Sequence, residues 1–469
     1  MTDKPNFLFF FPDQHRGDWM PYSKDIFKTM GMNELPLRMP NLKKLMEKGV
    51  TFTNAISSSP LCAPARACLA AGLRYRACRV AGNYEDYPVD QKTYYSVLRN
   101  NEYSVGSVGK LDFHKPNLYW GLNGWLPDLE KMGFTHVIDN EGKWDAIRSV
   151  IMEKGDKGRK KRVKPINFKP KGPYLKYLAD NDLLITHVKD FNKRFGKKNL
   201  NSDPTPLPQH AYCDNWLTNN AINMLREFPK DKPWHLVVNF TGPHDPWDIT
   251  QRMKKAWENG LFPSPNKGNE KKIEEEIKVR QNYAAMLENI DRNIGLILEE
   301  VEKRGELNNT IIIYSSDHGE MLGDFESYGK TRPQKGSVKI PLVITGPNIK
   351  KGIYSDALVE LQDLTSTMID YAGARMEEAK DSLSVRHILE GNDDVHRRYQ
   401  ISALDLSKVG VKEWKMISDG GFKLVVENGD TYKLYNLKDD PWENNDISGE
   451  NLLILNKLLK ELNLIYSNG

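Results

Sequence analysis

The stretch Asn6-Phe-Leu-Phe-Phe-Phe11 decides the fold prediction, because Asp13 and Gln14 follow it after a single proline. A nearly continuous apolar run of this length is typical of a strand covered on both faces, as in a parallel or mixed sheet flanked by helices. Three later runs also end in polar or ionisable residues; they cover residues 103–108, 235–240 and 310–314. Ligands bind at the carboxyl ends of such strands. The sequence therefore predicts an α/β fold in which these four strand ends form one site.

The rest of the chain predicts a second, smaller unit. Apolar residues recur every three or four positions between residues 273 and 301, which indicates a helix leading into the strand at residue 310. Residues 415–437 predict antiparallel strands separated by Asp419-Gly-Gly421 and Glu427-Asn-Gly-Asp430, both hairpin signals, and a last helix is expected over residues 451–465. We expect a main domain over residues 1–350 and a C-terminal α/β domain with an antiparallel sheet over residues 351–469.

Composition bounds the class of protein. The 469 residues exceed the size at which one hydrophobic core usually stops growing, which agrees with two domains. Apolar residues make up 39% and charged residues 28%, a mixture that excludes disorder of the whole chain. A formal charge of +4 does not argue for a nucleic-acid partner. Four cysteines are too few to form a disulfide scaffold, and their spacing does not suggest zinc.

The N-terminal apolar run is too short for the core of a signal peptide, and no apolar stretch approaches the roughly 18 residues that cross a bilayer. We therefore expect a cytoplasmic protein without a membrane partner. A chain trimmed of an export signal would look the same.

Cys62-Ala-Pro-Ala-Arg66 indicates a loop that turns into a helix, with Pro64 near the first turn. Unpaired backbone N–H groups and the positive end of the helix dipole would attract an anion beside Cys62. Arg66, one turn further, adds a guanidinium suited to a tetrahedral oxyanion. The plain alternative is a buried cysteine ahead of a helix, because free cysteine is commonly a small core residue.

Two polar pairs, Asp13-Gln14 and Asp317-His318, each follow a predicted strand. Their carboxylates, amide oxygen and imidazole suit Ca²⁺ or Mg²⁺, and the histidine also admits Mn²⁺. Each pair alone could be an Asx turn or a helix cap, but two pairs favour a metal site.

Three further residues, Lys110, His244 and Lys330, supply cations or proton carriers near the same strand ends. His244 is the natural acid or base, because its ordinary pKa lies near neutrality.

Together these residues resemble the formylglycine-dependent sulfatases of the alkaline-phosphatase-like superfamily. The resemblance rests on NFLFFFPDQ (6–14), CAPARACLAAG (62–72), GK (109–110), GPHDP (242–246), TIIIYSSDHG (310–319), GK (329–330) and KLYNLKDDPWENND (433–446). It implies an alkaline-phosphatase-like fold, with a large mixed sheet flanked by helices and a smaller C-terminal domain.

The resemblance also implies residue roles. A separate maturation enzyme would oxidise Cys62 to formylglycine, whose hydrated aldehyde attacks sulfur and is stabilised by Arg66. The implied metal ligands are Asp13, Gln14, Asp317 and His318, with Ca²⁺ as the first choice. The implied sulfate-binding and proton-transfer residues are Lys110, His244 and Lys330. The substrate would be a sulfate monoester, and we expect a carbohydrate sulfate.

Three positions depart from the family pattern. Ala65 replaces the usual serine of the Cys62 motif, and Gln14 stands where many members have a second metal aspartate. Asp112 stands where many members place a histidine two residues after the lysine. His114 could replace that proton donor if the strand end bends, or Asp112 could read the substrate, because a similar Gly-Lys-Leu-Asp sequence occurs in relatives that act on uronate 2-sulfates.

Two other functions stay open at this point. The first is a phosphonate monoester or phosphodiester hydrolase of the same superfamily, because sulfate and phosphate esters share tetrahedral geometry. The second is a non-catalytic polyanion-binding protein that uses the basic segment 154–164. The residues that would bind the polyanion are Lys157, Arg159, Lys160, Lys161, Arg162 and Lys164. Sugar-stacking walls are a further possibility for Trp120, Trp125, Trp144, Trp234 and Trp247, although packing is the commoner role.

Overall fold

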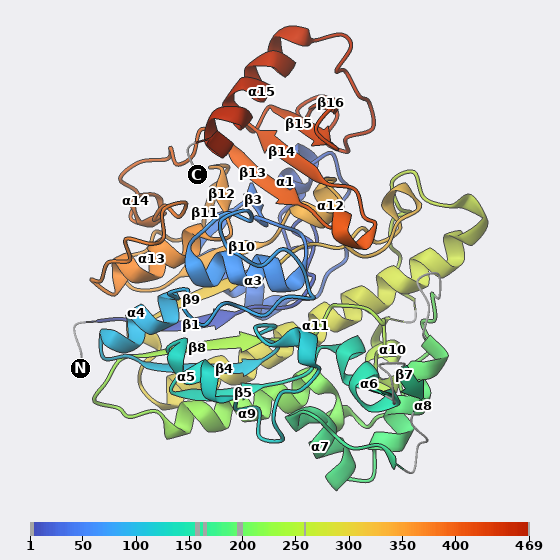
Figure 1. Cartoon of the computed structure of the whole chain (residues 1–469), viewed down its shortest axis with the longest axis vertical. Helices are drawn as coiled ribbons and strands as arrows, with labels where there is room; N and C mark the ends of the chain where they lie inside the picture. The colour runs from blue at the N-terminus through green and yellow to red at the C-terminus, as the bar shows by residue number, and fades with distance from the viewer. Residues whose placement is uncertain (1–3, 155–159, 163–166, 195–199, 258, 468–469) are drawn as a thin grey trace.

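The computed structural model describes residues 4–154, 160–162, 167–194, 200–257 and 259–467, and its main feature is an eight-stranded mixed sheet (Figure 1). In spatial order the strands are β11 (Ile353–Ser355), β2 (Gly49–Phe52), β10 (Leu342–Thr345), β9 (Thr310–Ser315), β1 (Asn6–Phe10), β8 (Trp234–Asn239), β4 (Ser104–Gly109) and β5 (His136–Asp139). Only β10 runs antiparallel to its neighbours within this sheet. The predicted α/β fold with a large mixed sheet is confirmed.

Strand β1 shows why the apolar run is continuous. Alternate side chains of a strand point to opposite faces, so Phe7 and Phe9 enter one hydrophobic core while Leu8 and Phe10 enter another. The first core includes α3 (Cys62–Ala71), α4 (Tyr94–Asn100) and α13 (Asp363–Tyr371); the second includes α9 (Cys213–Glu227) and α11 (Ile273–Lys303). Figure 1 shows these two helix layers on either side of the sheet. The helix predicted over residues 273–301 is thus α11.

The four strands predicted from apolar runs are β1, β4, β8 and β9, and they are neighbours in the order β9-β1-β8-β4. They run parallel to one another. Their carboxyl ends therefore lie along one edge of the sheet, which brings their polar endings together as expected.

The C-terminal part forms a four-stranded antiparallel sheet, as the two hairpin signals predicted. Its strands are β13 (Gln400–Leu404), β14 (Trp414–Ser418), β15 (Phe422–Glu427) and β16 (Thr431–Asn436), and α15 (Leu452–Ser467) packs on it through a separate apolar cluster. The domain boundary at residue 350 stays a prediction. Strand β11 lies beyond residue 350 and joins the large sheet.

The remaining elements connect these units. The helices are α1 (Lys24–Thr29), α2 (Pro40–Lys48), α5 (Pro127–Lys131), α6 (Lys143–Ile151), α7 (Pro173–Asp180), α8 (Leu184–Arg194), α10 (Gln251–Trp257), α12 (Lys335–Val338) and α14 (Arg386–Leu389). The short strands are β3 (Ala55–Ile56), β12 (Val359–Glu360), β6 (Met152–Lys154) and β7 (Lys160–Arg162). The described helices include none with the length and apolar character of a membrane span.

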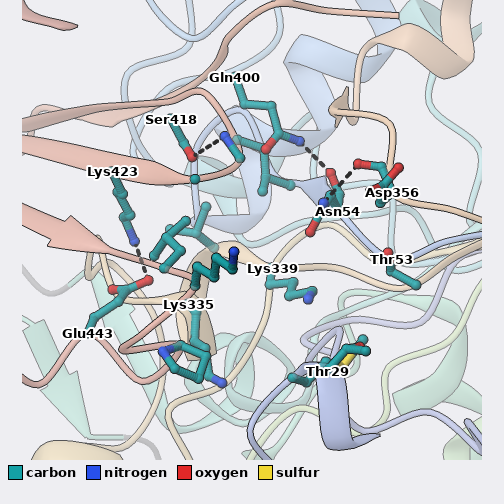
Figure 2. A pocket seen from close by; sticks show the side chains of 18 of the residues that line it. Thr29, Thr53, Asn54, Lys335, Lys339, Asp356, Gln400, Ser418, Lys423 and Glu443 are labelled. Atoms are coloured by element: carbon teal, nitrogen blue, oxygen red, sulfur yellow. Dashed lines mark hydrogen bonds and ion pairs between the residues drawn. The ribbon is translucent and has the colours of Figure 1, made fainter. Parts of the chain in front are cut away.

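The basic segment 154–164 belongs to this connecting part. Part of the segment belongs to the antiparallel strands β6 and β7. The rest of it lies outside the described residues. A cavity of about 750 Å³ lies between the main sheet region and the C-terminal sheet (Figure 2).

Candidate active site

The turn after β1 and the turn after β9 bring both predicted metal pairs together. The backbone N–H of Gln14 donates to Asp317 Oδ1 at 3.0 Å. The N–H of Asp13 donates to the carbonyls of Phe240 and Gly242, which follow β8. Backbone hydrogen bonds between neighbouring strand ends therefore hold these side chains in place.

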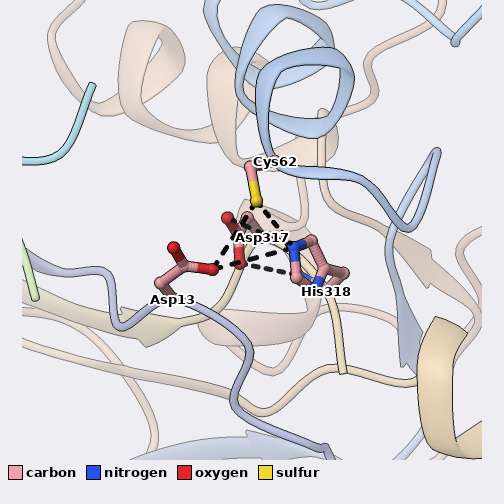
Figure 3. Close-up of side chains that lie close together, drawn as sticks. All are labelled: Asp13, Cys62, Asp317 and His318. Carbon is pink, nitrogen blue, oxygen red and sulfur yellow. Dashed lines mark hydrogen bonds and ion pairs between the residues drawn. The ribbon is translucent and has the colours of Figure 1, made fainter. Parts of the chain in front are cut away.

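Cys62 is the first residue of α3, so it stands where the helix presents unpaired backbone N–H groups. It is 1% exposed. Its Sγ lies 3.3 Å from Nε2 of His318 and 3.8 Å from Oδ1 of Asp13. One potential ligand atom from each of Asp13, Cys62, Asp317 and His318 lies within 4.8 Å of the others (Figure 3).

Arg66 lies one helical turn beyond Cys62, so its side chain points back to the strand ends. Its Nε donates to Oδ2 of Asp317 at 3.0 Å, and NH1 donates to Oδ1 of Asn239 at 2.9 Å and to the carbonyl of Lys110. The guanidinium thus joins the ends of β9, β8 and β4 around the cysteine.

The three predicted cationic residues also reach the cluster. The Lys110 ammonium contacts Oδ2 of Asp13. Lys330 Nζ lies 2.6 Å from Oε1 of Gln14 and 2.6 Å from Nε2 of His244. On its other side, His244 Nδ1 lies 3.1 Å from Oδ1 of Asp245.

These cations change the acidity of the nucleophile position. Burial alone would raise the pKa of the Cys62 thiol, but Lys110, Lys330, His318 and Lys115 outweigh it and hold that pKa well below its ordinary value. An anionic atom at position 62 is therefore favoured. The Sγ atom stands in for whatever nucleophilic oxygen the matured side chain would carry.

The contact between His244 and Lys330 marks a place for an anion. Burial and the Lys330 charge lower the pKa of His244, while Asp245 and Asp13 raise it, and the net result is about 9. Two fully protonated nitrogens cannot face each other at 2.6 Å, so the pair either shares one proton or separates around an anion. A sulfate group is such an anion.

Asp112 and His114, the two candidates in the segment 109–114, have different contacts in the structure. Asp112 has φ 59°, and its Oδ2 lies 3.1 Å from the Lys110 ammonium and 2.8 Å from that of Lys115. Its buried Oδ1 has no hydrogen-bond partner among the described residues. His114 has no contact with the cluster in that same part of the chain, and burial lowers its pKa while Asp86 and Asp128 act to raise it. Asp112 thus joins the cluster through Lys110.

The Gln14 side chain is held by two neighbours of the cluster, Lys330 and Glu320. Its Oε1 accepts from Lys330, and its Nε2 contacts a carboxylate oxygen of Glu320. Ligation of a cation by this oxygen would require the Lys330 contact to be given up.

Two carboxylates and an imidazole that converge in this way fit a hard divalent cation. Asp13, Asp317 and His318 are the residues that would hold it. Lys110 and Arg66 already neutralise part of the carboxylate charge, so a cation would rearrange these contacts.

Sequence reasoning missed three residues of the site. Asn239 positions Arg66, Lys115 pairs with Asp112, and Asp245 supports His244. A signal existed for each: Asn239 lies within a predicted apolar run at its strand end, Lys115 follows Asp112 by three positions, and Asp245 belongs to the quoted GPHDP segment.

A cavity of about 770 Å³ adjoins the site on the Lys330 side and is lined by Asp245, Trp144, Trp247 and Arg332 among others. Trp144 Nε1 donates to Oδ2 of Asp245 at 2.6 Å, which ties one wall to the site. Of the five tryptophans considered as sugar walls, Trp144 and Trp247 line the cavity. Trp120 and Trp234 are fully buried, and Trp125 packs against a hydrophobic core.

Comparison with known proteins identifies the family of the chain. Residues 5–374 match the sulfatase family, and residues 323–466 match the C-terminal region of N-sulphoglucosamine sulphohydrolase. An arylsulfatase of Clostridium perfringens is 26% identical, with 84% of this chain and 80% of the relative covered. A choline-sulfatase of Rhizobium meliloti is also 26% identical, with 94% and 82% covered.

Solved structures show the same fold. A phosphonate monoester hydrolase of Agrobacterium radiobacter superposes with a TM-score of 0.77 at 19% identity, covering 99% of this chain and 96% of the other. A protein solved with its substrate D-glucosamine-2-N,6-O-disulfate superposes with a TM-score of 0.74 at 20% identity, covering 99% and 98%. The family match spans most of the chain and includes every residue of the site. The chain therefore belongs to the sulfatase family, in the alkaline-phosphatase-like superfamily, and is a hydrolase of sulfate esters.

Proposed function

We propose that the protein hydrolyses carbohydrate sulfate monoesters with a formylglycine nucleophile made from Cys62. The observation that supports this most directly is the place of Cys62 in the first turn of α3, within reach of His318 and Asp13 and under the charges of Lys110 and Lys330. These surroundings favour an anionic atom at the tip of the side chain, whereas a cysteine that only packs in the core stays a neutral thiol.

A maturation enzyme, which would supply the oxidant, would replace the Cys62 sulfur by an aldehyde oxygen, and addition of water to that aldehyde gives a hydrate. One hydroxyl attacks the ester sulfur and displaces the alcohol. The second hydroxyl then loses its proton as the C–O bond to sulfate breaks, which releases sulfate and restores the aldehyde. Arg66, held by Asp317 and Asn239, orients this side chain. Lys110, Lys330 and His244 hold the sulfuryl oxygens, whose charge grows as the ester S–O bond breaks. Asp245 and Asp13 raise the pKa of His244 to about 9, so once Lys330 moves from its Nε2 the imidazole can carry a proton and give it to the departing alcohol oxygen.

We propose Ca²⁺ as the bound cation, because most of the donors are hard oxygens. When bound, the ion would neutralise charge on a sulfuryl oxygen and on the attacking oxygen. Asp13, Asp317 and His318 would hold it, with Gln14 as a fourth ligand if its oxygen turns from Lys330.

The adjoining cavity supports a carbohydrate as the organic part of the substrate. Trp144 and Trp247 offer flat apolar surfaces, while Arg332 and Lys330 offer positive charge to further acidic groups of a sugar. Two relatives point the same way: an N-acetylglucosamine-6-O-sulfatase of Bacteroides thetaiotaomicron is 23% identical over 96% of this chain, and the sulfated glucosamine noted above is the substrate of a structural relative.

The test combines peptide mass spectrometry with a substrate panel. Protein produced with a maturation enzyme should carry an aldehyde at position 62 and hydrolyse aryl sulfates and defined sulfated saccharides, whereas Cys62→Ala should hydrolyse neither. An intact thiol at position 62 in fully active protein would refute the formylglycine nucleophile. Faster turnover of aryl phosphonates than of any sulfate ester would favour the phosphonate hydrolase alternative, and turnover of aryl sulfates alone would refute the carbohydrate assignment.

A further inference from the structure

The cavity between the main sheet region and the C-terminal sheet, hereafter the inter-sheet cavity, is separate from the residues of the active site. It has a volume of about 750 Å³. Elements from both parts of the chain form its walls: α12 and the β2–β3 turn on one side, and β14, β15 and the segment after β16 on the other (Figure 2). A space of this size accommodates a small organic molecule.

Part of the lining of the inter-sheet cavity is apolar. Apolar side chains from both sides of the cavity contribute: Ile26, Met30, Ile56, Val338, Met416 and Leu437. An occupant with an apolar body would remove this surface from water.

The polar part of the lining is positively charged. Four lysines contribute to it, against the carboxylates of Asp356 and Glu443. Glu443 is paired directly with Lys423, because its Oε1 lies 2.8 Å from that ammonium in a buried ion pair. Lys335 stacks over the Trp442 ring at 3.7 Å and reaches its nearest carboxylate, Asp18, only at 3.9 Å.

Lys339 lies deeper in the lining than the exposed Lys438 and has no direct ion pair in the described part of the chain. Its ammonium makes no hydrogen bond or ion pair with any described residue, although its side chain lines the cavity beside Lys335 (Figure 2). Burial and the Lys335 charge lower its pKa to about 8; Arg16 also lowers it, while Asp18 and Glu443 act in the opposite direction. Two neighbouring ammonium groups that share one carboxylate at long range repel each other, and an anion between them would relieve this cost.

We propose that the inter-sheet cavity binds an amphiphilic organic anion, whose sulfonate, sulfate or phosphate headgroup is held by Lys339 and Lys335 and whose apolar body lies against Met30, Ile56 and Met416. The site is independent of the chemistry at Cys62, since none of its lining residues belongs to the active site. Lys423 and Glu443 act as a fixed pair that shapes the wall and leaves the headgroup to the two α12-side lysines.

Isothermal titration calorimetry with 1-naphthalenesulfonate at pH 7 tests the proposal on the full chain, because a sulfonate has no ester bond to hydrolyse. The parent protein should bind the probe, and Lys339→Met should weaken binding about tenfold or more through loss of the charged contact. Lys335→Met should weaken it as well. Lys339→Arg, which keeps the charge, should retain most of the affinity.

The controls separate this site from the catalytic one. Lys438→Met, on the exposed rim of the cavity, and Lys330→Met, in the active site, should leave the affinity within about twofold of the parent. Loss of binding in Lys330→Met, with none in Lys339→Met, would place the probe at the active site and overturn the proposal. Failure of the parent to bind, or equal binding of the neutral 1-naphthalenesulfonamide, would also overturn it. If Lys339→Met does not fold, Lys339→Gln provides the same comparison.

Discussion

Lysines line both the active site and the inter-sheet cavity, but their charges are compensated differently. In the active site Lys110 contacts Asp13 and Arg66 contacts Asp317. In the cavity Lys423 has Glu443, whereas Lys339 has no such partner among the described residues. The first region is electrostatically organised before a substrate arrives, as transition-state stabilisation requires. The second becomes balanced only when an anion enters.

The largest effect should follow from removing one carboxylate from the active site. Asp317→Ala should abolish both metal binding and turnover, because Asp317 is a candidate ligand and also holds Arg66. The measurements are bound Ca²⁺ by elemental analysis after dialysis, and kcat/KM with an aryl sulfate. Asp356→Ala in the wall of the cavity is the matched control and should change neither. Full activity of Asp317→Ala after exhaustive chelation would refute the metal assignment.

The sequence predicted the active site better than the cavity for a physical reason. Parallel strands align their carboxyl ends, so Asp13, Lys110 and Asp317 could be placed together from short apolar runs that end in polar residues. The helix start at Cys62 was also readable, from Pro64 and the following apolar residues. The finer contacts were not, because the turn of Asp112 toward Lys110 depends on a positive φ that no local pattern specifies.

The inter-sheet cavity depends on how two separately formed units pack. Lys335 begins the short helix α12 and Lys339 directly follows its end, while Lys423 and Glu443 come from the C-terminal sheet and the segment after it. The two glycine-containing turn signals predicted the hairpins of that sheet, but they contain no information on which lysine pairs with a carboxylate of the other unit. Such pairing is a tertiary property, and only the structure separates Lys423 from Lys339.

A smaller effect should follow from changing the carboxylate that links Lys110 to Lys115. Asp112→Asn removes one negative charge between two ammonium groups at 3.1 and 2.8 Å, so Lys110 should shift from its place beside Asp13. We expect kcat/KM to fall about tenfold, equivalent to about 1.4 kcal/mol of transition-state stabilisation. Because the effect acts through Lys110, aryl and sugar sulfates should lose equally.

The choice of substrate makes this prediction decisive. A loss restricted to sugar sulfates would show that the unpartnered Oδ1 of Asp112 contacts the sugar directly. No loss on either substrate would reduce Asp112 to a loop residue. His114→Gln is the matched control within the same segment and should leave both rates unchanged, because His114 has no described contact with the cluster.

The smallest expected effect tests the cavity through stability. Lys339→Met removes a desolvated charge without breaking an ion pair, so it should raise the free energy of unfolding at pH 7 by about 1 kcal/mol. The gain should depend on pH. The folded-state pKa of Lys339 is lowered to about 8 from its ordinary 10.5, so between these values the unfolded chain binds more protons and the parent gains stability as pH rises. The advantage of Lys339→Met should therefore shrink through this window and vanish above it, as measured by urea unfolding at pH 7 and at pH 10.5.

Lys423→Met is the matched control for this last prediction, because it removes a lysine from the same cavity but leaves Glu443 buried and unpaired. It should destabilise the protein by about 3 kcal/mol at pH 7. If the two substitutions change the free energy of unfolding in opposite directions, the charge of Lys423 is compensated within the protein, whereas the charge of Lys339 is compensated only by a ligand. Equal destabilisation by both would mean that Lys339 has a stabilising role in the protein without ligand, and would remove the electrostatic reason for an anion in the cavity.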